Sequence, residues 1–256
     1  GLRADGATFI DEAVARGAIA VVTPKMPAMV PTKVTFIQVA DPRAMLAKVA
    51  QRYYKFPDRE MEVVGVTGTN GKTTTAELVN IPVSANTMSC QPCGNYGVPF
   101  AEVVLQDEVP EVVALELSSF QLETTVDFKP DAVIWLNFSA DHMDRYHDLM
   151  EYFEAKQRIF AKVDDETPVV IREGETLLAL PGLPGKITTF STEEEADWFL
   201  RGDDIFCGDS HFIDVSKNRL RGLHNAENLM AACAVVEGIT PEVAQAALVD
   251  YAPPVH

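Results

Sequence analysis

Runs of apolar residues alternate with helix-like stretches along most of the chain. From residue 61 onward, apolar runs of strand length recur, and a helix-compatible segment follows several of them. Alternation of this kind predicts an α/β fold in which a mostly parallel sheet is flanked by helices. The expected strands cover residues 62–66, 112–117, 131–137 and 168–171, with short β segments and turns in 187–223 and a helix in 224–239.

The first 58 residues carry a smaller pattern of the same kind. A helix-like apolar stripe ends at Gly17, and two strands and a second helix are expected after it. Residues 55–60 are polar and include a proline, which is typical of a boundary between domains. We therefore expect a small N-terminal α/β domain over residues 1–58 and a larger domain over residues 59–256.

The first long apolar run of the larger domain leads into a glycine-rich segment, GTNGKTT, which begins at Gly68. The common phosphate-binding pattern would place a glycine at position 66, where this chain has Val66. Gly68 and Gly71 permit a close backbone approach to an anion, and a helix start adds free N–H groups and a favourable dipole. Lys72 would supply a charge for phosphates, and Thr73 a hydroxyl for Mg²⁺. The alternative is a plain strand–turn–helix connection.

A second apolar run, Val112–Leu115, ends at Glu116. In open α/β sheets, ligands lie beyond the carboxyl ends of the strands, so this carboxylate is expected beside the glycine-rich segment. A carboxylate in that place suits a Mg²⁺ ion. Glu123 stands several residues further on and is a weaker candidate. The alternative is a solvated acid at a strand end.

A third apolar run is followed by several residues that carry chemistry. His142 is either a metal ligand or an ordinary loop histidine, and its place beside two other candidate strand ends favours a function. The polar and charged residues after this run are Asn137, Asp141, His142, Asp144 and Arg145.

The next segment, residues 148–160, predicts a helix with Asp148 as its N-cap and Glu151 three places later. Its apolar stripe has one gap, which Lys156 occupies. A lysine on an inward face is normally ion-paired, or it buries its aliphatic stem while its ammonium group reaches solvent. Alternatively, burial lowers its pKa and leaves a neutral amine that reacts with CO₂ to form a carbamate, an anion that nearby Mg²⁺ would stabilise. The apolar positions are Leu149, Tyr152, Phe153, Ile159 and Phe160.

Composition narrows the classes of partner. The 256 residues include 38 acidic and 21 basic ones, so the formal net charge of −17 argues against nucleic acids and anionic membranes as partners. No apolar run approaches the roughly 18 residues of a membrane span, and the first residues lack the layout of a signal peptide. The four cysteines are expected to be free thiols in a reducing compartment. We expect a cytoplasmic monomer.

The ordered motifs resemble the central ATPase domain of the Mur ligases, cytoplasmic enzymes that add amino acids to the UDP-linked muramoyl precursor of peptidoglycan. The resemblance covers about residues 59–256, and its loop is the family's compact G[ST]NGK[ST] form, which accounts for Val66. ELSSFQLE and DHMDRY are most similar to the D-glutamate-adding branch, whereas residues 1–58 look more like the diaminopimelate- or lysine-adding branch. The motifs are GTNGKTTT, ELSSFQLE, LNFSADHMDRY, EAKQRIF and GLHNAEN.

The resemblance implies a role for each matching residue. Lys72 contacts the phosphates of ATP, Thr73 and Glu116 hold one Mg²⁺, His142 is a ligand of a second Mg²⁺, and Lys156 is carbamylated. Asn228 is the candidate adenine contact. The remaining nucleotide positions implied are Gly68, Thr69, Asn70, Gly71, Thr74 and Asn225, and the positions facing the muramoyl substrate or the metal are Asn95, Ser118 and Gln121.

The implied reaction is ATP-dependent amide formation through an acyl phosphate, most simply with D-glutamate as the amino acid added. The family's C-terminal, amino-acid-binding domain and the upstream part of its N-terminal domain are expected to be absent from residues 1–256. A competing hypothesis is therefore an ATP- and Mg²⁺-binding module without ligase activity of its own. Two enzyme classes also stay open, another amino-acid-adding Mur ligase and a folylpolyglutamate synthetase-like enzyme. The folate enzyme should lack the combination of ELSSFQLE and DHMDRY.

Overall fold

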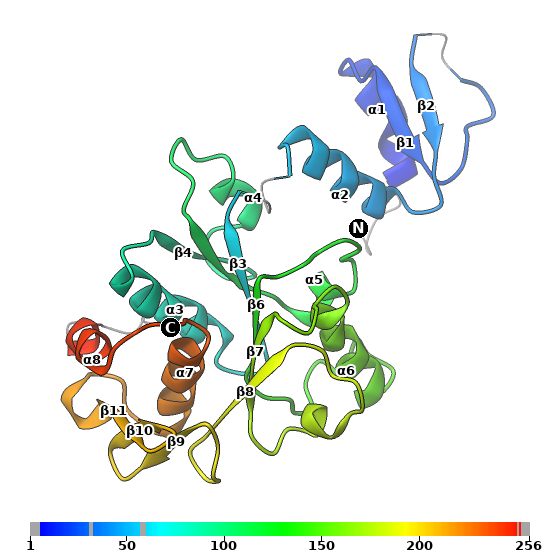
Figure 1. Cartoon of the computed structure of the whole chain (residues 1–256). Helices are drawn as coiled ribbons and strands as arrows, with labels where there is room; N and C mark the ends of the chain where they lie inside the picture. Colours follow the sequence, from blue (N-terminus) through cyan, green and yellow to red (C-terminus); the bar gives the residue numbers. More distant parts are fainter. Residues whose placement is uncertain (1–5, 31–32, 57–59, 250, 252–256) are drawn as a thin grey trace. The chain divides into compact units, whose positions relative to one another are not determined.

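The structure is a computed structural model that describes residues 6–30, 33–56, 60–249 and 251. Contacts divide the chain into two compact units, residues 1–56 and 57–256. Each unit has a sheet of its own (Figure 1). No helix among the described residues is long and apolar enough to cross a membrane.

The smaller unit contains the two short strands that its apolar pattern predicted, and they pair in parallel. Its first α-helix ends just before Gly17, which has a φ of 99°, a left-handed conformation that glycine adopts without a steric penalty. The stop expected at Gly17 is therefore confirmed. The elements are η1 (Gly6–Phe9), α1 (Ile10–Ala15), β1 (Ala20–Thr23), β2 (Thr35–Gln38) and α2 (Pro42–Tyr53).

The larger unit is built on a nine-stranded sheet in the order β11-β10-β9-β8-β7-β6-β3-β5-β4. Neighbouring strands from β4 to β9 run parallel, and β9, β10 and β11 pair antiparallel. The mostly parallel α/β sheet is thus confirmed. The strands are β3 (Glu62–Thr67), β4 (Cys90–Gly94), β5 (Val112–Glu116), β6 (Ala132–Trp135), β7 (Pro168–Arg172), β8 (Lys186–Ser191), β9 (Trp198–Arg201), β10 (Asp204–Cys207) and β11 (Ser210–Asp214).

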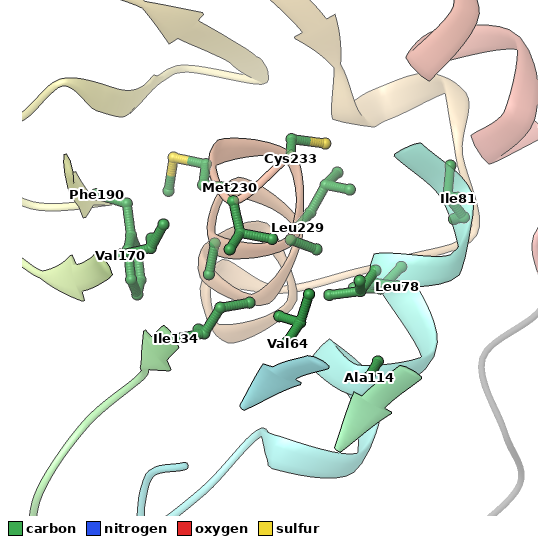
Figure 2. Packing of buried hydrophobic residues seen from close by; sticks show 14 of the residues in the cluster. Val64, Leu78, Ile81, Ala114, Ile134, Val170, Phe190, Leu229, Met230 and Cys233 are labelled. Carbon is green, nitrogen blue, oxygen red and sulfur yellow. The ribbon is translucent and has the colours of Figure 1, made fainter. Parts of the chain in front are cut away.

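Helices cover both faces of the parallel strands. Val64 and Val66 of β3 belong to an apolar cluster that includes residues of α3, α7 and α8, part of which Figure 2 shows. Val63, on the opposite face of the same strand, belongs to a second cluster with residues of α6 and η3. Burial on both faces explains why these strands are continuous apolar runs. The helices are α3 (Lys72–Ala85), α4 (Phe100–Val103), α5 (Ser119–Leu122), α6 (Leu149–Gln157), η3 (Arg158–Phe160), η4 (Thr176–Ala179), η5 (Val215–Lys217), α7 (Leu223–Ala234) and α8 (Pro241–Val249).

Two local features differ from the sequence-based expectation. Strand β4 was not predicted, because its sequence CQPCG contains proline and glycine. It pairs only with β5 at the edge of the sheet, where a missing proline N–H does not interrupt a ladder. In α6, Asp148 caps the Glu151 N–H as expected, but the Glu151 carboxylate accepts from the His147 N–H rather than from Asp148. Leu149 of the predicted apolar stripe is 44% exposed.

Candidate functional site

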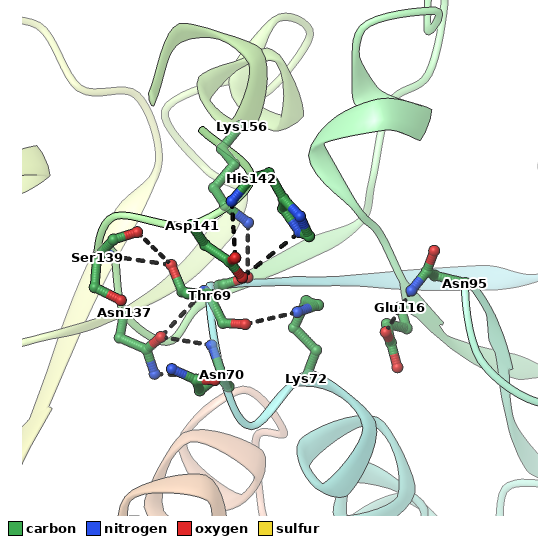
Figure 3. Close-up of polar contacts among 11 residues, drawn as sticks. Thr69, Asn70, Lys72, Asn95, Glu116, Asn137, Ser139, Asp141, His142 and Lys156 are labelled. Carbon is green, nitrogen blue, oxygen red and sulfur yellow. Dashed lines mark hydrogen bonds and ion pairs between the residues drawn. The ribbon is translucent and has the colours of Figure 1, made fainter. Parts of the chain in front are cut away.

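The predicted strand ends lie side by side because β6, β3, β5 and β4 are consecutive in the sheet. In the parallel register, Val66 of β3 pairs with Glu116 of β5, and Thr67 of β3 pairs with Trp135 of β6. Gly94 of β4 pairs with Glu116 from the other side. The side chains that follow these ends surround the glycine-rich loop (Figure 3).

The loop between β3 and α3 depends on Gly71. This residue precedes α3 with a φ of 83°, which favours glycine. A Cβ atom at Gly71 would collide with the side-chain oxygen of Asn228 in α7, so a larger residue here would require that side chain to move. The first N–H groups of α3 and the positive end of its dipole follow at once. This combination suits a phosphate group.

Asn137, just beyond β6, holds this loop in shape. Its Oδ1 accepts from the Thr69 N–H at 3.1 Å and from the Asn70 N–H at 2.8 Å, and its Nδ2 donates to the Asn70 carbonyl at 3.1 Å. The Thr69 hydroxyl donates to the Ser139 carbonyl at 3.2 Å and accepts from the Ser139 N–H at 3.0 Å. The sequence placed Asn137 at a strand end but did not reveal this role, whose only signal was its position directly after an apolar run.

Two lysines donate to the backbone of the loop. Lys72 Nζ donates to the Thr69 carbonyl at 3.0 Å, and Lys156 Nζ donates to the Gly68 carbonyl at 2.6 Å. Lys156 is 2% exposed and its Nζ lies 5.0 Å from the centre of the Tyr152 ring. The gap in the apolar stripe of α6 therefore corresponds to an inward-facing lysine.

Burial changes the protonation of this lysine pair. The pKa of Lys156 is lowered to about 7: burial is the largest cause, the positive charge of Lys72 acts in the same direction, and Asp141 and Glu116 oppose the change. Burial also lowers the pKa of Lys72, against the attraction of Glu116 and Asp141. Near pH 7, a large fraction of Lys156 is therefore a neutral amine, which is a nucleophile.

Thr73, Glu116 and Asn95 form a second group on the other side of the loop. The Thr73 hydroxyl donates to Glu116 Oε2 at 2.7 Å, and Asn95 Nδ2 donates to Glu116 Oε1 at 3.0 Å. Glu116 is 3% exposed. A hydroxyl and a carboxylate are oxygen donors of the kind that Mg²⁺ prefers. No cluster of three or more His, Cys, Asp or Glu that could hold a metal occurs in the described part of the chain.

His142 lies in the loop after β6, beside Asp141. Its N–H donates to Asp141 Oδ1 at 2.7 Å, and its Nε2 lies 3.6 Å from Asp141 Oδ2. The His142 side chain is 44% exposed, and its backbone has a φ of 56°, which is unusual for a residue with a Cβ. The ring centre lies 4.9 Å from that of Phe120. His142 is therefore accessible to a ligand from solvent.

Of the remaining predicted residues, Ser118, Gln121 and Asn225 make hydrogen bonds to residues close by in the sequence. Ser118 and Gln121 form a capping box at α5: Gln121 Oε1 accepts from the Ser118 N–H and hydroxyl, each at 3.0 Å, and Ser118 Oγ accepts from the Gln121 N–H at 3.3 Å. Thr74 is half-buried in the first turn of α3. Asn225 Nδ2 donates to the Arg221 carbonyl at 2.8 Å, whereas the buried Asn228 side chain abuts Gly71.

The arrangement has counterparts among known proteins. The chain matches the Mur ligase middle domain over residues 66–236, which is well over half of its length. The chain belongs to the Mur ligase family. The family resemblance carried by the five motifs is thereby confirmed.

Individual members of the Mur ligase family differ in the reaction that their names state. A UDP-N-acetylmuramoylalanine–D-glutamate ligase from Exiguobacterium sibiricum is 35% identical over 176 residues, which are 68% of this chain and 39% of that protein. A solved UDP-N-acetylmuramoyl-L-alanyl-D-glutamate–2,6-diaminopimelate ligase has a TM-score of 0.73 at 22% identity, over 97% of this chain and 58% of the other. A MurF ligase from Thermotoga maritima in complex with ADP has a TM-score of 0.64 at 23% identity, over 92% of this chain and 57% of the other.

The chain thus spans about two fifths of that curated relative and less than two thirds of the two solved chains. Both structural likenesses are below 25% identity and therefore concern the fold alone. The relative that is similar in sequence and the first of the two solved structures are named for different reactions, so family membership does not specify one reaction.

Proposed function

We propose that this chain binds ATP and Mg²⁺ for a cytoplasmic ligase that adds D-glutamate to a UDP-N-acetylmuramoyl precursor in peptidoglycan synthesis. The observation that carries the proposal is the 2.7 Å hydrogen bond between Thr73 and Glu116, directly beside the glycine-rich loop. It joins a helix-start hydroxyl to a buried carboxylate, the pair of oxygen donors that a phosphate-bound Mg²⁺ requires.

In this proposal the loop binds the phosphates of ATP. The backbone from Gly68 to Thr74 forms the anion site, with Thr69 and Asn70 held by Asn137, and Lys72 neutralises charge on the phosphoryl group. The substrate carboxylate attacks the γ-phosphorus, the bond to ADP breaks, and an acyl phosphate forms. The amine of the amino acid then attacks the acyl carbon and gives up a proton to solvent, and phosphate leaves with the electrons of its bond to that carbon. Asn225 and Asn228 are proposed to lie near the nucleotide, with Asn228 at the adenine.

Two Mg²⁺ sites are part of the proposal. Thr73 and Glu116 would hold the first, and His142 would contribute to the second. Bound Mg²⁺ would neutralise negative charge that develops on the transferred phosphoryl group. Asn95, through its hydrogen bond to Glu116, orients that carboxylate, and Ser118 and Gln121 are proposed to face the muramoyl substrate.

Lys156 is proposed to carry a carbamate. Its lowered pKa of about 7 leaves neutral amine available. The nitrogen bonds to the carbon of CO₂ and loses one proton, and the product is an anion beside Lys72. Rescue of a Lys156→Ala variant by added short carboxylates in a ligase assay tests this role. Full activity of the untreated variant would exclude it.

Phosphate release tests the whole proposal. The present chain, and a longer form that carries a C-terminal domain, are to be assayed with ATP, Mg²⁺, UDP-N-acetylmuramoyl acceptors and a panel of amino acids. Release by the longer form that requires the L-alanyl acceptor and D-glutamate supports the assignment, and preference for diaminopimelate or lysine would move it to another branch. Absence of acceptor-dependent release from the longer form would refute the ligase assignment.

A second candidate rests on the same site. The glycine-rich loop, Thr73 and Glu116 concern ATP and Mg²⁺ alone, so residues 1–256 are also proposed as an ATP- and Mg²⁺-binding module without ligase activity of its own. Nucleotide binding by residues 1–256 without acceptor-dependent phosphate release, together with release by the longer form, would support this second candidate.

A further inference from the structure

Glu123 is held by two side chains from the loop that carries His142. Its Oε2 accepts from Arg145 Nη2 at 2.5 Å, and its Oε1 accepts from the Tyr146 hydroxyl at 2.5 Å. The Glu123 and Arg145 side chains are 28% and 31% exposed, and Tyr146 is buried. Both carboxylate oxygens are thus engaged within the protein, as those of Glu116 are, but Glu123 is paired with a guanidinium, whereas Glu116 accepts from the neutral side chains of Thr73 and Asn95.

The two residues that Glu123 holds also close the turn at His142. The Arg145 N–H donates to the His142 carbonyl at 2.9 Å, and the Tyr146 N–H lies 3.2 Å from the same oxygen. His142 itself has a φ of 56°, a left-handed conformation that a residue with a Cβ adopts only when its surroundings impose it. The contacts on its C-terminal side are therefore candidates for imposing that conformation.

Phe120, in the short helix α5 that precedes Glu123, also contacts the loop that carries His142. The Arg145 guanidinium carbon lies 4.5 Å from the centre of the Phe120 ring, and the ring centre of His142 lies 4.9 Å from it. Phe120 is part of α5, and Glu123 directly follows that helix. Because α5 comes just after β5, whose last residue is Glu116, this short segment joins the end of β5 to the His142 loop.

We infer that Glu123 is a positioning residue that holds His142 in place relative to Glu116 by binding Arg145 and Tyr146. The set Glu123, Arg145 and Tyr146 is here named the Glu123 clamp. The structural half of the inference concerns the position of His142 alone. The functional half of the inference, that the clamp lowers the Mg²⁺ concentration needed for nucleotide binding, rests on the proposed function.

The structural half is tested by NMR of the histidine ring protons in the intact chain without metal or nucleotide. The chain has five histidines, and a His142→Gln variant assigns the resonance. Ring-current shifts from Phe120 are expected to separate His142 from the 92% exposed His147. In Glu123→Ala the His142 resonance should move towards that of His147, and in Glu123→Gln, which retains one acceptor, it should move less.

The functional half is tested by calorimetric titration of ATP at a series of Mg²⁺ concentrations. Half-maximal binding in Glu123→Ala should require roughly three- to tenfold more Mg²⁺, the effect of losing charge-assisted hydrogen bonds in a partly exposed site. Tyr146→Phe should give a smaller increase. Glu154→Gln, which changes an exposed carboxylate of α6, is the matched control and should leave both readouts unchanged.

The outcomes distinguish failure of the proposed ATP- and Mg²⁺-binding function from failure of the Glu123 clamp. If the unmodified chain binds no ATP with Mg²⁺, the proposed function fails, and the histidine spectrum still decides whether the clamp positions His142. If it binds ATP and Glu123→Ala leaves the His142 resonance in place, the inference is overturned. A shifted resonance with an unchanged Mg²⁺ requirement overturns the functional half. Should Glu123→Ala fail to fold, Glu123→Gln and Tyr146→Phe provide the same two readouts.

Discussion

Replacement of Lys156 by methionine is expected to stabilise the larger unit at neutral pH. The pKa of Lys156 is lowered from 10.5 to about 7, chiefly by burial. Between these two pH values the unfolded chain binds more protons at this site than the folded chain does. Raising the pH therefore favours the folded state: the destabilisation by Lys156 is complete below about pH 7 and disappears above pH 10.5.

The size of the effect follows from the same two pKa values. A lowering of this extent corresponds to about 5 kcal/mol of destabilisation below pH 7, to order of magnitude. Methionine removes that cost but leaves the Gly68 carbonyl without its 2.6 Å hydrogen bond, a loss of roughly 1–3 kcal/mol. Lys156→Met should therefore be about 2–4 kcal/mol more stable than the unmodified chain near pH 7, the net of these two contributions.

Urea denaturation at pH 7, 8 and 9 measures the difference in unfolding free energy between Lys156→Met and the unmodified chain, and how that difference changes with pH. Buffers free of CO₂ keep the amine from forming a carbamate, and both tryptophans, Trp135 and Trp198, report on the larger unit. The stability advantage of Lys156→Met should fall by about 1.4 kcal/mol per pH unit, because unfolding of the unmodified chain takes up one proton at Lys156. Lys162→Met, at an exposed lysine that follows η3, is the control. Parallel pH profiles for the unmodified chain and Lys156→Met would refute the reasoning.

Three further variants test the remaining parts of the site. Gly71→Ala should destabilise the chain by about 1–2 kcal/mol through its left-handed φ and should abolish ATP binding. Adding Asn228→Ala should recover only the part of the lost stability that is due to the collision with Asn228. Thermal unfolding measures the stability and calorimetry the ATP binding, and full recovery of stability would contradict the backbone argument. Glu116→Gln should raise the Mg²⁺ requirement of ATP binding about tenfold or more, while unchanged binding would remove Glu116 from the metal site. Asn137→Ala should cost about 1–3 kcal/mol in thermal unfolding, because its side chain makes three hydrogen bonds to the loop, and a change below about 0.5 kcal/mol would show that the loop holds its shape without them.

Several elements were predictable because their signal lies in neighbouring residues. The central strands are buried on both faces, so their sequences are continuous apolar runs that can be recognised without a structure. The inward position of Lys156 was predictable from the gap in a helical stripe, since helix periodicity alone decides which face a residue occupies. Strand β4 was not predictable, because its CQPCG sequence is compatible with a strand only at the edge that the whole sheet provides.

The polar contacts of the site were less predictable. The sequence identified Glu116 and His142 as strand-end candidates and ranked Glu123 below them, but gave no reason for that order beyond spacing. The tertiary structure supplies one: Glu123 is ion-paired with Arg145, which stands more than 20 positions later in the chain, whereas Glu116 accepts from the neutral side chains of Thr73 and Asn95. A hydrogen bond between such distant residues depends on how the strand ends are aligned in space.

The sequence by itself determined that an α/β sheet forms, that Lys156 faces inward, and that a glycine-rich loop and three strand ends carry the polar residues. Only the tertiary structure decided that Asn137 shapes the loop, that Asn228 requires glycine at position 71, and that burial next to Lys72 brings the pKa of Lys156 to about 7. The physical reason is one of range. Periodicity and backbone preference act between near neighbours, whereas desolvation, close backbone approach and hydrogen bonding between strand ends exist only after distant segments have packed together.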